Sequence, residues 1–291
     1  MENLRGSVLM VLAMAGFALE DSFIKILARD LPIGEILCLL GFGGAMTFAL
    51  ICHLRGVAFL SRDILNPMVA LRNLGEMIAA MGYVTAIVLT PLSSASAIIQ
   101  ATPLTITMGA ALFMNEQVGR RRWSAICIGF LGVLLIIRPG LSGFQPASLF
   151  AVLAVLGLTI RDLATRVAPI TVSSLQLSGY AFAALIPAGL IILSITGEVT
   201  LPSAQNWGLL ISGQVFGMSA YLAIVAAMRL GDVSVITPFR YTRLIFALII
   251  GITIFGERPG LLTYMGAFLI IASGLYSILR ERHIARRAAL C

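Results

Sequence analysis

FALEDSFIK at residues 17–25 is followed 141 residues later (158 − 17 = 141) by LTIRDLATR at residues 158–166. Both stretches lie inside long apolar runs, and in both an aspartate stands four residues before a basic residue. Charged side chains inside a hydrocarbon-spanning helix cost free energy and tend to mark a binding site or a pathway. A pattern that recurs at half the chain length indicates two copies of one unit. Together the two observations favour a transporter.

The composition is that of a membrane protein. Of the 291 residues, 59% are hydrophobic and 11% are charged, with a mean hydropathy of +1.00. A spanning helix needs about 20 mostly apolar residues, and the expected fold class is an all-α polytopic membrane protein with ten transmembrane helices. Their approximate ranges are 6–28, 33–52, 67–89, 92–114, 123–138, 147–165, 173–196, 206–228, 233–255 and 260–279.

The start of the chain also resembles a signal peptide. Arg5 precedes an apolar run that contains the small-residue pattern Ala13-Met14-Ala15. Cleavage at this point would remove the segment whose charges match those of the second half. We therefore expect residues 6–28 to be the first helix of the protein.

Basic residues predict the orientation of the helices. With ten spans, twelve arginines fall on the side that holds both termini and three on the other. The positive-inside rule then places both termini in the cytoplasm, which fits a multi-pass protein of a bacterial inner membrane. The net charge of +7 follows from this topology, so nucleic acid is not an expected partner. The twelve are Arg5, Arg55, Arg62, Arg120, Arg121, Arg122, Arg166, Arg229, Arg280, Arg282, Arg286 and Arg287; the three are Arg29, Arg138 and Arg258.

The sequence gives no pattern for an enzyme, a cofactor or a metal. The spacing of Cys38, Cys52, Cys127 and Cys291 fits neither a disulfide framework nor a metal site. His53 and His283 lie at helix ends without a ligand constellation around them. No Walker motif is present, so ATP is not the expected energy source.

The 141-residue offset extends well beyond the opening stretches. It relates Glu116 to Glu257 (257 − 116 = 141), and it also aligns Ser93 with Ser234, Trp123 with Tyr264 and Ala97 with Pro238. Each half then holds five spans, and because five is odd the second copy enters the membrane from the opposite side. We expect an inverted repeat, an architecture typical of secondary transporters. The expected units are residues 1–141, residues 142–282 and a cytoplasmic basic tail, residues 283–291.

Two motifs resemble the paired EamA domains of the drug/metabolite transporter superfamily. Asn115-Glu116 leads into an apolar helix that contains Gly129 and Gly132, and Gly256-Glu257-Arg258-Pro259 precedes the last helix. The resemblance covers residues 7–280, and the segment from Pro238 to Pro259 is similar to carriers described as S-adenosylmethionine or riboflavin uptake proteins. The resemblance implies a cavity between helices one to four and six to nine, with the fifth and tenth helices outside it.

Helical spacing indicates which charges can pair. On translocon-type scales a mid-helix Arg, Lys or Asp costs roughly 2.5–3.5 kcal/mol, so each needs a partner or water. Residues four apart share a helix face, which allows three intrahelical pairs. These are Asp21 with Lys25, Asp162 with Arg166, and Arg72 with Glu76. Such pairs are either structural or part of a site.

The remaining intramembrane charges are the stronger candidates for ligand contact. Glu20 and Arg161 occupy equivalent positions with opposite signs, and we expect them to face the cavity, contacting each other or a zwitterionic ligand. Arg240 and Arg243 share a face next to Pro238, which would free backbone carbonyls. Their expected partner is Glu76 or an anionic group of the substrate, because arginine binds carboxylate and phosphate bidentately.

Aromatic residues at similar depth are candidates for the cavity wall. Tyr221 and Tyr241 are the preferred ones, and Tyr83 and Phe216 lie at comparable depth. Most aromatic residues in membrane helices serve packing or the interfacial belt.

The expected function is secondary transport of a small polar or zwitterionic metabolite, amino-acid-like or S-adenosylmethionine-like, by alternating access. Export of amino acids, other metabolites or drugs is the alternative, and a channel-like facilitator is the alternative from another class. Glu20, Asp21 and Glu76 could bind a coupling proton, although exchange and facilitated diffusion are also allowed. The expected partners are the substrate and the lipid bilayer, and the expected state is a monomer or a weak homodimer.

Overall fold

The computed structural model describes residues 2–141, 144–169, 171–197, 199–230 and 233–288, and every regular element in these ranges is a helix. The side chains of residues 225, 228, 229, 233, 234 and 281–288 are not part of the description. The side chain of Ser234 and the predicted tail at 283–291 therefore lie outside the described residues, apart from the backbone that continues the last helix to Ala288.

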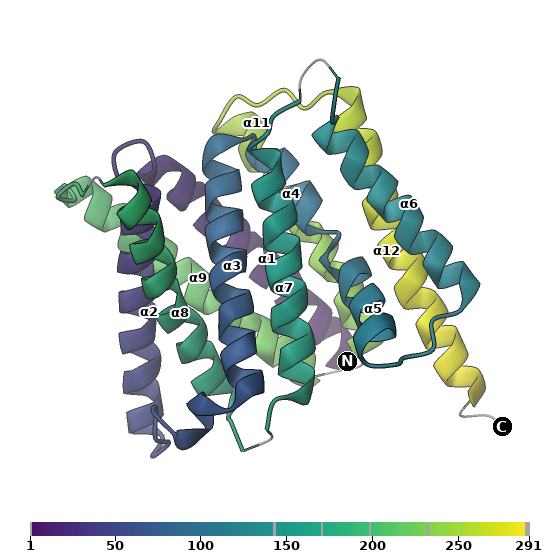
Figure 1. The fold of residues 1–291 in the computed structure, drawn as a ribbon, viewed down its shortest axis with the longest axis horizontal. Helices are drawn as coiled ribbons and strands as arrows, with labels where there is room; N and C mark the ends of the chain where they lie inside the picture. Colours follow the sequence, from purple (N-terminus) through teal and green to yellow (C-terminus); the bar gives the residue numbers. More distant parts are fainter. Residues whose placement is uncertain (1, 142–143, 170, 198, 231–232, 289–291) are drawn as a thin grey trace.

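The helices form ten consecutive units, five in each half of the chain (Figure 1). Two units are broken, the fourth into α4 and α5 and the ninth into α10, η2 and α11, and a short 3₁₀ turn, η1, precedes α3. The elements are α1 (Glu2–Leu27), α2 (Ile33–Leu54), η1 (Arg62–Leu65), α3 (Pro67–Leu89), α4 (Leu92–Ile99), α5 (Thr102–Phe113), α6 (Arg120–Ile137), α7 (Ser148–Val167), α8 (Ser174–Thr196), α9 (Ala204–Leu230), α10 (Val233–Ile236), η2 (Thr237–Tyr241), α11 (Thr242–Thr253) and α12 (Leu261–Ala288).

These units coincide with the ten predicted spans to within a few residues, except that α12 runs beyond 279. Seven of them are long and apolar enough to cross a membrane by length and composition. The other three carry an identifiable interruption: α3 contains Arg72 and Glu76, α6 begins with three arginines, and the ninth unit is broken at Thr237–Tyr241. The all-α polytopic fold class is confirmed.

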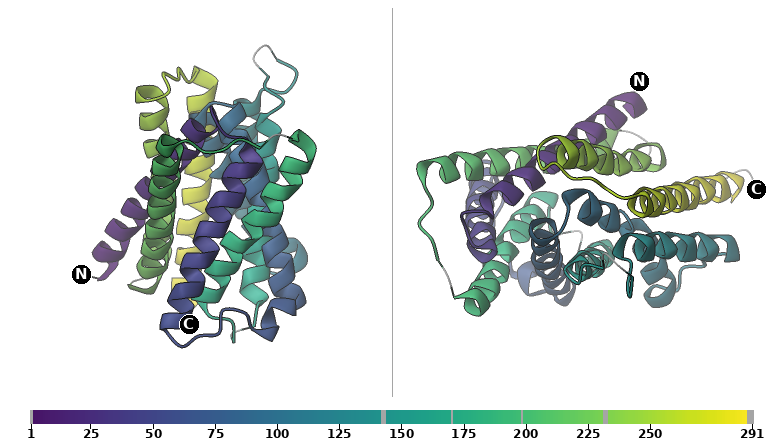
Figure 2. Two further views of the ribbon diagram at one scale, coloured as in Figure 1. Left: turned by 90° about the vertical axis from the view of Figure 1, so that its left-hand side faces the viewer. Right: turned by 90° about the horizontal axis from the view of Figure 1, so that it is seen from above.

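The two halves are inverted copies that interlock. Helix α1 begins, and α12 ends, on one side of the molecule, the lower side in Figure 1; we call it the terminal side and the other the opposite side. Helix α1 runs from the terminal side to the opposite side, whereas its equivalent α7 runs the other way. Helix α1 packs along α9 as α7 packs along α3, while α2 pairs with α8 and α6 with α12 (Figures 1 and 2). Every one of these contacts obeys the same pseudo-twofold relation.

Small residues allow the paired helices to touch through their backbones. A Cβ atom at Gly157 of α7 would lie 2.7 Å from the carbonyl oxygen of Gly75 on α3. At the α2–α8 contact, a Cβ at Gly34 would meet the backbone oxygen of Gly189. Close approach at small residues is a common way to stabilise helix pairs in membranes, where lipid gives no hydrophobic drive for association. The central helices are therefore held at nearly the minimum separation.

The broken helices meet in the middle of the molecule. Helix α4 packs against α11, and Pro103 and Pro238 lie at the breaks of the fourth and ninth units. The carbonyl oxygen of Arg240 accepts a hydrogen bond from the Gln100 side chain at 3.1 Å. A backbone group freed by the break is thus satisfied by a side chain of the other half, as membrane-buried backbone requires.

The fourth helix of each repeat, which ends with α5 in the first and with α11 in the second, is followed by the same backbone motif. Asn115 and Gly256 are equivalent (256 − 115 = 141), and both adopt a left-handed conformation, with φ of 54° and 63°. The next residue folds back in each case: the Glu116 amide donates to Ala110 at 3.2 Å, and the Glu257 amide donates to Gly251 at 2.8 Å. Asparagine and glycine are the residues that adopt this conformation most readily.

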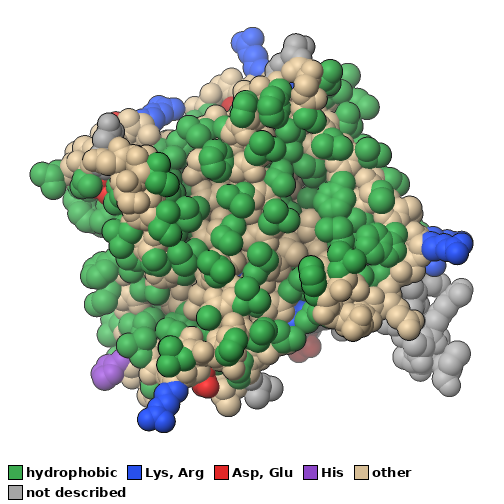
Figure 3. Space-filling model, in the orientation of Figure 1, with side chains coloured by type: hydrophobic (Ala, Val, Ile, Leu, Met, Phe, Trp, Pro, Cys, Tyr) green, Lys and Arg blue, Asp and Glu red, His purple; other side chains and the backbone are tan. Residues whose placement is uncertain are grey.

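The face of the molecule seen in Figure 3 is largely apolar. Figure 3 shows hydrophobic side chains spread over the visible face, with Lys and Arg at its margins. Leu50, Leu131 and Phe268 are examples of large side chains that are more than half exposed. Such exposure across the middle of the helices fits a lipid-facing surface, since lipid replaces water around them.

Candidate substrate cavity

A cavity of about 490 Å³ lies between the two repeats. Its lining residues come from the first to fourth helices and the sixth to ninth, and none of the described lining residues belongs to α6 or α12. This is the arrangement that the family resemblance implies. Eight charged residues line the cavity: Glu20, Asp21, Arg72, Glu76, Arg161, Asp162, Arg240 and Arg243.

Asp21 and Arg243 join α1 to α11 on one wall of the cavity. The Arg243 guanidinium donates to both Asp21 oxygens, at 2.9 and 2.7 Å from Nη2 and at 3.2 Å from Nε. Its carbon Cζ also lies 5.2 Å from the Phe17 ring centre and 5.0 Å from that of Tyr83. A hydrogen-bonded pair enclosed between aromatic faces suits a guanidinium removed from water.

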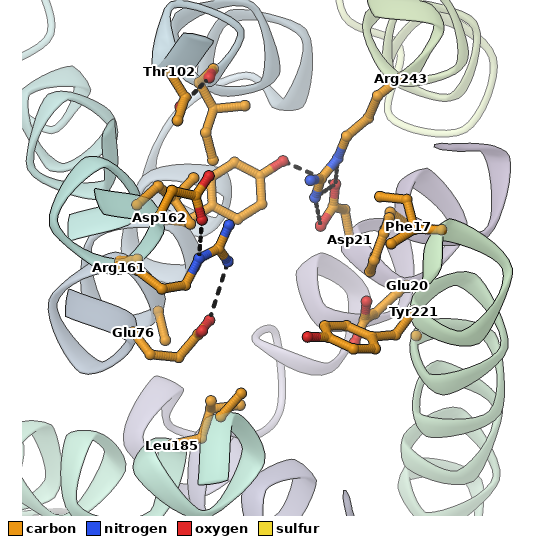
Figure 4. A pocket seen from close by; sticks show the side chains of 18 of the residues that line it. Phe17, Glu20, Asp21, Glu76, Thr102, Arg161, Asp162, Leu185, Tyr221 and Arg243 are labelled. Carbon is orange, nitrogen blue, oxygen red and sulfur yellow. Dashed lines mark hydrogen bonds and ion pairs between the residues drawn. The ribbon is translucent and has the colours of Figure 1, made fainter. Parts of the chain in front are cut away.

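Glu76 joins α3 to α7 on the facing wall. Its carboxylate lies 3.4 Å from Arg72 Nη2 and 3.6 Å from Arg161 Nη1. Arg161 also donates from Nε to its neighbour Asp162 at 2.7 Å. Figure 4 shows Arg161, Asp162 and Glu76 across the open space from Asp21, Glu20 and Tyr221. The predicted intrahelical pair of Arg72 and Glu76 is therefore present, as part of a larger network.

The other two predicted intrahelical pairs are wrong. Asp21 binds Arg243 instead of Lys25, and Lys25 lies 3.5 Å from Glu257. In the second copy Asp162 binds Arg161, while Arg166 lies 3.1 Å from Glu116. Lys25 does not line the cavity. The physical reason is that neighbouring helices supply closer and better-oriented partners than the (i, i+4) position.

The expectation that Glu76 would serve Arg240 and Arg243 is also wrong. Helix α3 packs against α7, so Glu76 meets Arg72 and Arg161, and Asp21 on α1 is the carboxylate within reach of Arg243.

Glu20 and Arg240 differ from the other charged lining residues. Among the described residues, no ion pair or hydrogen bond engages the Glu20 carboxylate or the Arg240 guanidinium. Glu20 lies against Gly217 of α9, where any Cβ atom would collide with its carboxylate. The cavity therefore presents one carboxylate and one guanidinium that the protein leaves available.

The repeat-related residues Glu20 and Arg161 both line the cavity, as expected, but they do not contact each other. They lie on opposite walls in Figure 4, and Arg161 is engaged by Asp162 and Glu76. The expected contact between Glu20 and Arg161 is therefore wrong, and contact of Glu20 with a ligand stays a prediction.

The aromatic candidates divide into wall and packing residues. Tyr221 and Tyr83 line the cavity, and the Tyr83 hydroxyl donates to Asp21 at 2.8 Å. Tyr241 does not line it: its hydroxyl points at α12, where a Cβ on Gly274 would collide with it. Phe216 faces away as well, being 39% exposed and stacked on Phe23 at 5.8 Å. The expectation of Tyr241 and Phe216 as wall residues is therefore not met.

Several lining residues have no place in the sequence prediction. Gln100, Thr102 and Pro103 line the cavity at the break between α4 and α5. Phe182 of α8 lines it too. The signal for the first group was present: polar residues next to a proline inside an apolar run mark a discontinuous helix, which in transporters commonly forms part of the binding site. Within the described ranges, no group of three or more His, Cys, Asp or Glu side chains could hold a metal ion.

Known proteins resemble this chain along most of its length. An S-adenosylmethionine uptake transporter of Rickettsia felis is 26% identical over 226 residues, covering 75% of this chain and 73% of its own. A riboflavin transporter of Vibrio cholerae is 29% identical over 203 residues, covering 68% of this chain and 66% of its own. A pseudopaline exporter of Pseudomonas aeruginosa is 26% identical over 276 residues, covering 92% and 94%.

A solved crystal structure shares the fold, with a TM-score of 0.61 at 19% identity over 97% of this chain and 98% of the other. The EamA-like transporter family matches residues 4–138 and again residues 145–279, two segments separated by the same offset that relates the charges (145 − 4 = 141). Its relatives are transporters and not enzymes. Since the two matches span nearly the whole sequence, the chain belongs to the EamA-like transporter family.

Proposed function

We propose that this transporter carries a small zwitterionic metabolite, with Glu20 binding its cationic group and Arg240 its carboxylate. The observation that carries the proposal is that one carboxyl group and one guanidinium in the cavity form no hydrogen bond or ion pair with the described residues. Burying a charge is costly unless it is paired, so a ligand that supplies both missing partners gains affinity at both ends. A neutral ligand would leave both charges unmatched.

The size and walls of the cavity support the same class of substrate. A volume of about 490 Å³ is in the range of metabolite-sized pockets, which span roughly 300–1,000 Å³. Phe17, Tyr83 and Tyr221 give the cavity aromatic surface between the charged groups. An amino acid fits this description, and so does an amino acid joined to an aromatic base, such as S-adenosylmethionine. The name of the Rickettsia relative is consistent with the latter.

Binding measurements on purified protein test whether Glu20 binds the cationic group of the substrate and Arg240 its carboxylate. We expect Glu20→Gln to weaken binding of a zwitterion roughly 10–100-fold, the value of a hydrogen bond to a charged group. The same variant should bind the analogue without the amino group as wild type does. Arg240→Gln should show the converse selectivity toward the analogue without the carboxylate. Glu35→Gln is the matched control, because Glu35 accepts a hydrogen bond from the Thr200 amide away from the cavity.

If each variant lost affinity equally for the zwitterion and for both analogues, the assignment of Glu20 to the cationic group and Arg240 to the carboxylate would be contradicted. Binding of riboflavin by wild type and both variants with the same affinity would replace the zwitterion with a neutral aromatic substrate, as in the Vibrio relative.

We further infer a secondary carrier with alternating access in a bacterial inner membrane, with both termini in the cytoplasm. The inverted repeat and the excess of arginine on the terminal side support this. Counterflow in proteoliposomes tests it: a carrier shows saturable exchange of labelled for unlabelled substrate, whereas a channel-like facilitator does not. Sidedness of net flux in the same vesicles separates uptake from export, the activity named for the Pseudomonas relative.

A further inference from the structure

Two ion pairs occupy equivalent positions at opposite ends of the spanning helices. Lys25 pairs with Glu257 on the opposite side, and Arg166 pairs with Glu116 on the terminal side. The offset relates both members (166 − 25 = 141; 257 − 116 = 141). Each pair joins the end of the first helix of one repeat to the residue that follows the fourth helix of the other. Each therefore crosses the boundary between the two repeats.

The Lys25–Glu257 pair is largely buried and is hydrogen-bonded to the backbone. Glu257 accepts hydrogen bonds from the backbone amides of Leu92 and Ser93, the latter at 3.0 Å, and from the Ser93 hydroxyl at 2.6 Å. Lys25 donates to the carbonyls of Ile87 at 2.7 Å and Thr90 at 2.6 Å. The two side chains are 16% and 8% exposed. This pair therefore ties α1 and the end of α11 to the turn between α3 and α4.

The Arg166–Glu116 pair is open to its surroundings. Its side chains are 49% and 47% exposed, although the ion pair itself is 3.1 Å long. The cavity also extends toward this side, because Thr165 near the end of α7 and Ser174 at the start of α8 line it. Toward the opposite side it is covered by buried apolar residues, among them Leu27, Ile87 and Leu92. The structure therefore shows a cavity that reaches the terminal side and is closed at the other.

We propose that the two ion pairs are the alternating barriers of the transport cycle, and that Glu257 and Glu116 are the residues that close them in turn. When the cavity opens to the opposite side, the Lys25–Glu257 pair loses its backbone partners and becomes exposed, while Arg166 and Glu116 become buried between the repeats. The inference rests on the proposed carrier cycle and not on the identity of the substrate.

Besides the exchange of lysine for arginine, the two barriers differ in the residue that faces the glutamate. The Glu257 carboxylate lies against Gly251, where a Cβ atom would come 2.6 Å from Oε2. The equivalent residue next to Glu116 is Ala110 (251 − 110 = 141). A methyl group at this position leaves less room for the carboxylate than a glycine does. We therefore expect Glu116 to fold back less far, and the closed barrier of the opposite side to be the more stable one.

A reporter cysteine in the cavity tests this inference. Leu158 lines the cavity midway along α7, so Leu158→Cys, in a protein whose native cysteines are replaced by alanine, reports access from either side. A membrane-impermeant maleimide is applied to oriented proteoliposomes from one side at a time. The unmodified barriers should give faster labelling from the terminal side.

Equivalent substitutions should then shift access in opposite directions. We expect Glu257→Gln to raise labelling from the opposite side by about tenfold or more, the effect of losing hydrogen bonds to a charged group. Glu116→Gln should lower labelling from the opposite side or leave it at the basal level, and it should raise labelling from the terminal side. Ser93→Ala and Gly251→Ala are milder variants that perturb only the closed pair, and both should act in the direction of Glu257→Gln. Ala110→Gly should act in that direction as well, because it lets Glu116 fold back.

Two results would overturn the proposal: labelling that is the same in Glu257→Gln and in its parent, or a shift of the same sign in Glu257→Gln and Glu116→Gln. The readout requires no substrate. Failure of the barriers is thus distinguishable from failure of the zwitterion assignment, in which the labelling would shift as stated and no zwitterion would bind.

Discussion

Arg243 on α11 binds Asp21 on α1 through both oxygens of its carboxylate, and the pair joins residues 222 positions apart in the two repeats. Asp21 is 3% exposed, so its carboxylate is almost entirely enclosed by protein. Among the described residues the Asp21–Arg243 contact is the shortest ion pair between the repeats, and it joins α1 to α11 at the wall of the cavity next to Glu20.

We predict that Asp21→Asn lowers the thermal stability of the detergent-solubilised protein strongly. Removing one member of a buried pair costs about 3–5 kcal/mol, because the other charge stays buried without a partner. Thermal unfolding followed by intrinsic fluorescence measures the change. Arg166→Gln, which removes a half-exposed pair, is the control and should cost about 1 kcal/mol or less. A double variant, Asp21→Asn with Arg243→Gln, that is no more stable than the single one would argue against this explanation.

We predict that Tyr83→Phe has a small effect on stability. The change removes the hydroxyl that donates to Asp21 at 2.8 Å and lies 3.2 Å from Ser96 Oγ, but it keeps the ring beside Arg243. A hydrogen bond of this kind contributes about 1 kcal/mol. The measurement is again thermal unfolding, with the half-exposed Tyr276→Phe as control. A loss as large as that of Asp21→Asn would show that the hydroxyl, and not the ion pair, holds the wall together.

We predict that Gly157→Ala separates α7 from α3 and destabilises the protein. The added methyl group would lie 2.7 Å from the Gly75 carbonyl oxygen, and overpacking of this kind costs roughly 1–3 kcal/mol. Gly208→Ala on α9 is the matched control, because nothing lies within 4 Å of its added Cβ. That control should be neutral or slightly stabilising, since alanine favours a helix over glycine. Equal stability of the two variants would remove the backbone contact as a source of stability.

We predict that Glu76→Gln retains substrate binding but loses accumulation driven by a pH gradient. Glu76 is not one of the two proposed anchors, so affinity should remain, but glutamine cannot take up and release a proton. Binding is measured by thermal shift and accumulation in proteoliposomes with an imposed gradient. Glu35→Gln, at a position that does not line the cavity, should accumulate substrate as the wild type does. Full gradient-driven accumulation by Glu76→Gln would exclude a coupling role for this residue.

The helices and their repeat could be predicted from sequence because each depends on a local signal. A run of about 20 apolar residues is sufficient to indicate a span, and the recurrence of charges at one offset indicates a second copy. The breaks at residues 100–101 and 237–241 could be predicted from the sequence only in part. Pro238 indicated a loosened turn, but which polar group would satisfy the freed carbonyl depended on the packing of α4 against α11.

The partners of the charged residues could not be predicted, because spacing along a helix states which residues share a face but not what that face meets. Asp21 and Lys25 share a face of α1, yet they bind Arg243 and Glu257, which α11 and the turn after it bring close. Tyr241 shows a second limit. It lies in a 3₁₀ segment, whose three residues per turn rotate the side chain toward α12, away from where an α-helix would direct it.

The positions of Glu20 and Arg161 have a consequence for how a substrate is oriented. A symmetric dimer of one five-helix protein would carry the same residue at both positions. Its cavity would then offer the same contacts to a ligand in either of two opposite orientations. Two copies joined in one polypeptide are free of that restriction, because the equivalent positions can carry different residues, as Glu20 and Arg161 do. Glu20 has no ion pair among the described residues on one wall, whereas Arg161 is held by Asp162 and Glu76 on the other, so the two walls of the cavity present different groups to its interior.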